Sequence, residues 1–137
     1  MQIVQASCFG ATVVVTMTQA QCRNALVPTV PDEFPSTIAM VIDGTETRAV
    51  VLTGASGHFC AGGHFKGMAP NAALPKADLR VPRSLRSAYR WFDELVDLEK
   101  PVIAAVDGVA FGAGCAAGGF APGGTFWKYA GGSHWYC

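Results

Sequence analysis

The chain has 137 residues, of which half are apolar and 15% are charged, and its formal net charge is zero. This length and this apolar content are typical of one globular domain and argue against extensive intrinsic disorder. Because lysine and arginine form no run, we expect neither nucleic acid nor an anionic membrane surface to be a partner.

The N-terminal part of the chain predicts a β-hairpin followed by a helix. Residues 3–9 and 11–18 have the composition of two strands that meet at Gly10. After a polar loop, Pro31 suits the first turn of a helix that we expect to end at Gly44. The apolar residues that recur at helical spacing in this segment are Phe34, Ile38, Val41 and Ile42.

The middle of the chain predicts two buried strands joined by a helix. An apolar run at residues 48–53 and another at 102–106 are each typical of a strand covered on both faces. Between them, a loop over residues 68–76 precedes a long amphipathic helix. This order indicates a right-handed crossover between parallel strands, whose carboxyl ends are where open α/β sheets place ligands. The apolar residues of the helix are Leu79, Leu85, Tyr89, Phe92, Leu95 and Leu98.

The C-terminal stretch has a different character. Residues 101–121 approach the length of a membrane span, but they contain Asp107 and five glycines, so we expect a buried strand and the start of a helix instead. From Gly118 the sequence shows no periodicity. We therefore divide the chain into an α/β part, residues 1–117, and a tail, residues 118–137, that we expect to be irregular.

The cysteines and the N-terminus bear on the cellular compartment. The five cysteines are odd in number, none forms a C-x-x-C pair, and none lies at metal-ligand spacing to a histidine. We therefore predict free thiols in a reducing compartment and no metal site. The N-terminal residues M-Q-I-V-Q-A-S lack the basic start and apolar core of a signal peptide, so we expect a cytoplasmic protein.

Two glycine-rich loops follow the two predicted central strands. The first contains Ala61-Gly62-Gly63 and the second spans residues 108–114. Glycine lets backbone N–H groups approach a ligand closely, and two N–H groups directed at one carbonyl oxygen form an oxyanion hole that stabilises a thioester enolate. A helix beginning near Ala113 would add its positive end. Either loop alone is also explained by a tight turn, so this hypothesis depends on the pair.

Four sequence motifs surround these loops. They are R-N-A-L at residues 23–26, R-A-V-V-L-T-G at 48–54, F-C-A-G-G-H-F-K-G-M at 59–68 and K-P-V-I-A-A-V-D-G-V-A-F-G-A-G at 100–114. In order and spacing, these motifs resemble the enoyl-CoA hydratase/isomerase (crotonase) family over roughly residues 1–115. The resemblance implies a crotonase-like α/β fold, with ββα-type units and a parallel sheet flanked by helices, of which the chain would hold the N-terminal half.

The resemblance also implies a site and a reaction. The chain would bind an acyl-CoA thioester and stabilise its enolate with the backbone N–H groups of Gly63 and Ala113, as enoyl-CoA hydratases and isomerases of fatty acid metabolism do. CoA would enter as part of the substrate, with no other cofactor and no metal. Members of the family form trimers or hexamers, which implies a homo-oligomer. The residues implied to contact the CoA thioester are Ala25, Leu26, Ala61, Gly63, His64, Phe65, Lys66 and Ala113.

The chain departs from the family pattern within this site. His64 stands where the family usually has aspartate, which is compatible with a tolerated change at a loop-to-helix cap or with proton transfer. Ala116 stands where hydratases of the family carry a glutamate, and their second catalytic glutamate lies beyond the matching region. Without paired carboxylates to activate water and protonate the α-carbon, we expect no hydration, while isomerase, hydrolase or other enolate chemistry stays open.

Other interpretations of the same residues stay open. The change of pattern at Gly118 is compatible with a truncated or frame-shifted, catalytically inactive fragment of the family. Gly112-x-Gly114-x-x-Ala117 formally fits a dinucleotide-binding fingerprint, but no Asp or Glu follows Ala117 to bind a ribose. The cysteines within the two loops are expected to act as small apolar residues rather than as nucleophiles.

Overall fold

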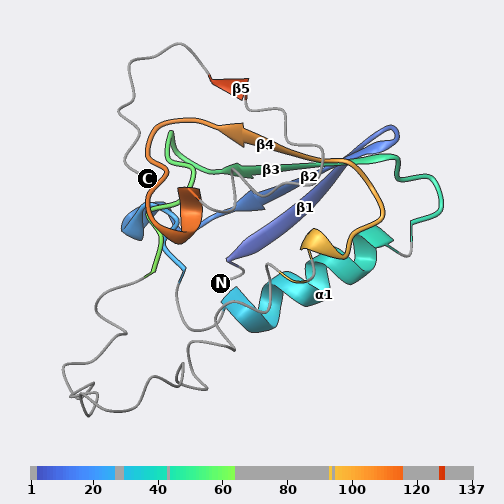
Figure 1. The fold of residues 1–137 in the computed structure, drawn as a ribbon, viewed down its shortest axis with the longest axis horizontal. Coiled ribbons are helices and arrows are strands. Elements are labelled where there is room, and N and C mark those ends of the chain that lie inside the picture. The colour runs from blue at the N-terminus through green and yellow to red at the C-terminus, as the bar shows by residue number, and fades with distance from the viewer. Residues whose placement is uncertain are drawn as a thin grey trace.

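The described part of the chain is a sheet with helices on one of its faces (Figure 1). The computed structural model describes residues 3–26, 30–42, 44–63, 93, 95–115 and 127–128. Its elements are β1 (Val4–Phe9), β2 (Thr12–Met17), the 3₁₀ helix η1 (Ala20–Cys22), α1 (Val30–Ile42), β3 (Ala49–Gly54), β4 (Val102–Val106) and β5 (Trp127–Lys128).

The sheet has five strands in the order β1-β2-β3-β4-β5. β1 and β2 are antiparallel, and Gly10 between them has a φ of +59°, which suits a tight hairpin turn. β3 pairs in parallel with β2 on one side and with β4 on the other, and β4 pairs in parallel with β5. The predicted hairpin, the two central strands and their parallel relation are confirmed, with strand ends shifted by at most one residue.

The helix α1 is also confirmed, and one hydrogen bond joins it to the sheet. It begins at Val30, directly before Pro31, and ends at Ile42, shortly before Gly44. The Glu33 carboxylate accepts the N–H of Ile3 at 2.7 Å, which fastens the first turn of α1 to the start of β1. α1 therefore lies on one face of the sheet, next to β1, as Figure 1 shows.

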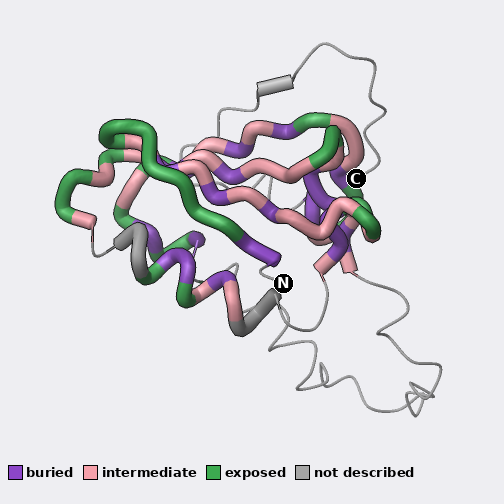
Figure 2. Tube along the Cα trace, turned by 180° about the vertical axis from the view of Figure 1, so that it is seen from behind, coloured by how far each residue is buried: buried purple, intermediate pink, exposed green. Residues whose placement is uncertain are grey.

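The hydrophobic core lies between the sheet and the helices. Phe34 and Ile38 of α1 are fully buried and lie one helical turn apart, so they face the strands together. Leu95 and Leu98, two of the apolar positions expected in the second helix, are buried in the same core. Figure 2 shows this burial beside the largely exposed strand β1. The buried strand residues opposite the helices are Val13, Val15, Met17, Val50, Leu52, Val102, Ala104 and Val106.

The strands are not fully covered on both faces, which corrects one expectation. Along β3 and β4, buried residues alternate with half-buried ones, because successive side chains of a pleated strand point to opposite faces. The half-buried set includes Val51 and Ile103, which are paired neighbours on the face away from the buried core. A continuous apolar run therefore did not distinguish a strand buried on both faces from one buried on a single face.

The C-terminal residues give a second correction. Trp127–Lys128 forms β5, so the expectation of an irregular tail is wrong for these two residues. Without β5, β4 would be an edge strand with unpaired N–H and C=O groups. Even a short segment without periodicity can pair with such an edge. The rest of the tail, the loop over residues 68–76 and most of the second predicted helix lie outside the described residues. The division at residues 117 and 118 stays a prediction.

A third correction concerns the cysteines. Cys8, Cys22 and Cys60 carry free thiols, as predicted, but Cys115 is disulfide-bonded. Pairing depends on whether two Cα atoms come within disulfide reach in the fold, which spacing along the chain does not reveal.

Among the described residues, no helix has the length and apolar character needed to cross a membrane.

Candidate functional site

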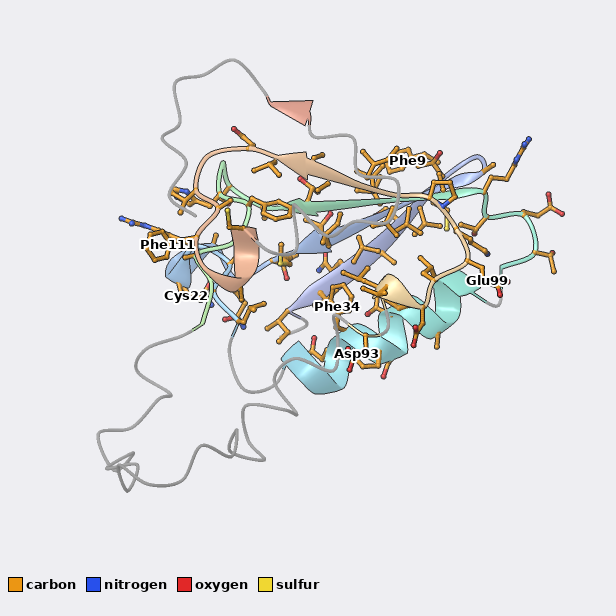
Figure 3. All side chains as sticks on the ribbon, viewed as in Figure 1. Phe9, Cys22, Phe34, Asp93, Glu99 and Phe111 are labelled. Atoms are coloured by element: carbon orange, nitrogen blue, oxygen red, sulfur yellow. The ribbon has the colours of Figure 1, made fainter. Side chains whose placement is uncertain are left out.

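The candidate site lies where three strands end. Because β2, β3 and β4 run in parallel, their carboxyl ends lie at the same edge of the sheet. Residues 20–26 after β2, residues 55–63 after β3 and residues 107–115 after β4 come together at this edge, as Figure 1 shows. The labelled side chains of Cys22 and Phe111 mark this end of the molecule in Figure 3.

The loop after β3 and the loop after β4 are hydrogen-bonded to each other. The N–H of Cys60 donates to the Val109 carbonyl at 2.9 Å, and the Cys60 carbonyl accepts the N–H of Phe111 at 2.9 Å. These bonds form a parallel bridge between Cys60 and Ala110. The two glycine-rich loops therefore form one unit, which is the condition on which the sequence hypothesis depended.

Glycine is required where the two loops touch. Gly62 has a φ of +80°, and a Cβ atom there would lie 2.5 Å from the carbonyl oxygen of Phe111. A Cβ atom on Gly114 would collide with the carbonyl oxygen of Cys60. Any larger residue would push the loops apart, because both obstacles are backbone atoms that cannot rotate away.

A third segment, residues 23–26, is joined to the loop after β3. The Arg23 carbonyl accepts the N–H of Ala61 at 3.0 Å, and the N–H of Leu26 donates to the Gly62 carbonyl at 2.7 Å. Leu26 and Gly63 form a second parallel bridge. The structure thus brings the R-N-A-L motif beside Ala61-Gly62-Gly63, with Ala25 buried and Leu26 half-buried.

The two N–H groups of the sequence hypothesis lie on adjoining loops. Ala113 is the first residue of a helical turn over residues 113–115, so its N–H has no acceptor within that turn, and the predicted helix start is confirmed. A Cβ atom on Gly62 would lie 3.5 Å from the Ala113 nitrogen. Outside helices and strands, no backbone hydrogen bond among the described residues uses the N–H of Gly63 or of Ala113.

Other predicted site residues lie outside the part of the chain that the structure describes. They are His64, Phe65, Lys66 and Ala116. Asp107 is exposed and is followed by Gly108 with a φ of +64°. Within the described ranges, no group of three or more His, Cys, Asp or Glu side chains could hold a metal ion.

Cys60 lies at the centre of the site but is not activated. Its side chain is fully buried, and loss of hydration raises the pKa of the thiol to about 11, although a backbone hydrogen bond from Gly62 lowers it in part. A nucleophilic cysteine needs the opposite shift, toward a thiolate near neutral pH. Cys60 therefore serves as a small apolar residue between the loops, as its sequence context indicated.

Asn24 is a residue whose role the sequence reasoning missed. Its side chain is 1% exposed, and its Nδ2 donates to the carbonyls of Ala55 at 3.0 Å and His58 at 2.5 Å. Both acceptors belong to the loop after β3, more than thirty residues further along the chain. The only signal in the sequence was the position of Asn24 within the R-N-A-L motif, and that position reveals no partner.

The comparisons with known proteins assign the chain to a class. The sequence profile described as Enoyl-CoA hydratase/isomerase matches residues 9–121 of the 137-residue chain. The chain therefore belongs to the enoyl-CoA hydratase/isomerase family, and its α/β sheet is part of the crotonase fold. The sequence resemblance is thereby confirmed.

Individual relatives agree with this assignment. The chain is 34% identical over 101 residues to a mitochondrial enoyl-CoA hydratase of Pongo abelii, covering 74% of this chain and 32% of that one. It is 36% identical over 92 residues to a carnitinyl-CoA dehydratase of Proteus mirabilis, covering 66% of this chain and 33% of that one. An enoyl-CoA hydratase structure from Polaromonas sp. JS666 superposes with a TM-score of 0.76 at 29% identity, covering 90% of this chain and 47% of that one.

The chain matches only part of the length of each relative. The chain spans about a third of the length of these curated relatives and about half of the solved structure. The matched part contains the described strand-end loops, since the profile runs from residue 9 to residue 121.

Proposed function

We propose that this chain binds an acyl-CoA thioester and stabilises the enolate of that thioester with the backbone N–H groups of Gly63 and Ala113. The observation that carries the proposal is the pairing of the two glycine-rich loops through Cys60, Val109 and Phe111. This pairing brings the Gly62 backbone up to Phe111 and Ala113. N–H donors held in this way gain strength as negative charge develops on a thioester oxygen, because they need no reorganisation.

The neighbouring residues support the same ligand. Ala25 and Leu26 lie beside the first loop and are small or apolar, which suits the uncharged pantetheine arm of CoA. The names of the relatives, enoyl-CoA hydratase and carnitinyl-CoA dehydratase, both refer to acyl-CoA substrates. We extend the same substrate class to this chain, with CoA as part of the substrate rather than as a cofactor.

The experiment uses acetoacetyl-CoA, a β-ketoacyl thioester whose enolate absorbs in the near ultraviolet. We expect the purified chain to bind acetoacetyl-CoA at neutral pH and to raise the enolate absorbance, because the site favours the anion over the neutral ketone. Calorimetry gives the affinity in the same buffer. Binding without any increase in enolate absorbance would contradict the proposed role of the two N–H groups.

A pair of variants at Ala113 isolates one N–H group. Ala113→Pro removes the N–H at the first position of a helical turn, where proline is tolerated. Proline restricts the backbone of the residue before it, and the glycine at position 112 accommodates this restriction best. We expect the stabilisation of the enolate to fall about 10²-fold, as when one oxyanion-hole donor is lost elsewhere. Ala113→Gly changes the same side chain but keeps the N–H, and it should retain the enolate signal.

Size measurements accompany these titrations. The family resemblance supports the further proposal that the chain forms a homo-oligomer, and a single oligomeric species that binds acyl-CoA would agree with it. A polydisperse aggregate that binds no acyl-CoA would instead favour the inactive-fragment interpretation. Binding of NAD in place of acyl-CoA would favour the dinucleotide interpretation. We also propose a cytoplasmic location, which cell fractionation tests.

A further inference from the structure

Asn24 joins two neighbouring segments of the candidate site. Its backbone belongs to the segment over residues 23–26, whereas both of its side-chain acceptors, Ala55 and His58, belong to the loop after β3. The residues on either side of Asn24 continue the same contact further along that loop, since Arg23 accepts from Ala61 and Leu26 donates to Gly62. Asn24 is therefore at the beginning of a row of contacts that ends at Gly63.

The orientation of the Asn24 amide follows from its surroundings. Both acceptors are backbone carbonyl oxygens, so only the NH₂ group of the amide can face them. Asn24 Oδ1 is buried and has no hydrogen-bond partner among the described residues. A buried acceptor without a partner costs stability, so the presence of asparagine is explained by its two donated bonds and not by its oxygen.

The backbone conformation restricts which residues fit at this position. Asn24 has a φ of +53°, in the left-handed region that asparagine and glycine adopt most readily. Asparagine also supplies two donors on a short side chain, which glycine does not. The Nδ2 atom would lie 2.7 Å from a Cβ atom on Gly54, so the end of β3 is packed directly against the amide. The amide is thus held between the end of β3 and the loop that follows.

We propose that Asn24 is a positioning residue for the oxyanion hole: its two hydrogen bonds to Ala55 and His58 set the register between the segment over residues 23–26 and the loop that carries Gly63. This inference rests on the proposed function, since it names the group that places one of the two N–H donors. Asn24 does not need to touch the substrate. A displacement of about 1 Å at the reacting atoms is enough to cost 10²-fold in rate.

The first test is amide hydrogen exchange in the full chain, and it requires no ligand. Asn24→Gly removes the amide and keeps the left-handed backbone accessible. We expect the N–H groups of Ala61 and Leu26 to exchange at least about tenfold faster, while that of Val50, which donates to Pro101 in the sheet, is unchanged. Equal acceleration of all three would show global destabilisation, and no acceleration would show that Asn24 holds nothing; either result overturns the inference.

Two further variants keep the test decisive if Asn24→Gly does not fold. Asn24→Asp has the same shape and tolerates the same φ, but it directs a carboxylate instead of two donors at the carbonyls, so it should behave like the glycine variant. Asn24→Ser keeps one donor and should recover part of the protection of Ala61. Ser56→Gly is the matched control, since Ser56 is exposed and also has a positive φ, of 61°. A change in Ala61 exchange in Ser56→Gly equal to that in Asn24→Gly would contradict the inference.

The second test compares two ligands that differ at one group. Butyryl-CoA has a thioester carbonyl, whereas S-butyl-CoA, a thioether, has none. If Asn24 positions Gly63, Asn24→Gly should weaken butyryl-CoA binding about tenfold and leave S-butyl-CoA binding unchanged. Equal weakening of both ligands would show a general structural role. A wild-type chain that binds neither ligand would refute the proposed function, and amide exchange would then still decide whether Asn24 sets the register.

Discussion

The N–H of Cys60 donates to the carbonyl of Val109 at 2.9 Å, and this bond fastens the loop after β3 to the loop after β4. The two loops follow neighbouring parallel strands. Through this contact the backbones of Gly62 and Ala113 approach each other. The proposed oxyanion hole of Gly63 and Ala113 depends on this approach.

Replacing Gly62 by alanine should separate the two loops. The new Cβ atom would lie 2.5 Å from the Phe111 carbonyl, and the φ of +80° adds backbone strain. We expect a loss of about 1–3 kcal/mol in the free energy of unfolding, measured with urea. Gly10→Ala is the control, because Gly10 has a φ of +59° with nothing within 4 Å of the added atom. An equal loss in both variants would mean that strain alone, and not the loop contact, explains the effect.

Cys60 should react slowly with thiol reagents. With a pKa raised to about 11 by burial, only about one thiol in a thousand is ionised at pH 8. We expect alkylation of Cys60 in the folded chain to be far slower than that of Cys8, which is exposed and free. Mass spectrometry after timed alkylation measures both rates. Comparable rates at the two cysteines would contradict the burial of Cys60.

The same pKa shift predicts how stability depends on pH. The folded-state pKa of Cys60 lies near 11 and the ordinary value is 9.0, so the folded state retains a proton that the unfolded state releases between these values. The contribution of Cys60 is fully present below pH 9 and is lost as the pH rises toward 11. Urea midpoints should fall over this window in the wild type and fall less in Cys60→Ala.

Truncation of Phe34 should unfold the chain or strongly lower its free energy of unfolding. Phe34 is fully buried between α1 and the sheet, whereas Phe9 on β1 is 66% exposed, and Figure 3 labels both. We expect Phe34→Ala to cost about 3–5 kcal/mol and Phe9→Ala to cost less than about 0.5 kcal/mol. Thermal and urea unfolding measure the difference. A similar cost for both would argue against a core on this face of the sheet.

The chain should not hydrate crotonyl-CoA at a measurable rate. By the family resemblance, Ala116 stands where hydratases of the family carry a glutamate. An alanine methyl group can neither activate water nor transfer a proton. The assay follows the loss of the enoyl absorbance, with a family hydratase as positive control. Ala116→Glu by itself should remain inactive, because one carboxylate does not provide both roles; efficient hydration by the wild type would refute this account.

Local patterns were sufficient for most of the secondary structure. The β-branched residues on both sides of Gly10 and the run at residues 102–106 have strong strand preferences, and α1 has apolar residues at helical spacing. These signals depend on near neighbours in the chain. β5 and the bonded state of Cys115 were not predicted, because each depends on a partner distant in sequence. Asn24 was missed for the same reason, since both acceptors of its amide lie in another loop.

The sequence by itself determined the family, the positions of β1 to β4 and of α1, and the glycines that allow the backbone to approach a ligand. Those properties are local, or they follow from the order and spacing of motifs. Only the tertiary structure decided that the two loops pair through Cys60, that residues 23–26 lie beside Gly63, and that Asn24 joins them. The physical reason is that parallel strands bring their carboxyl ends to one edge, where backbone hydrogen bonds form between segments that are far apart along the chain.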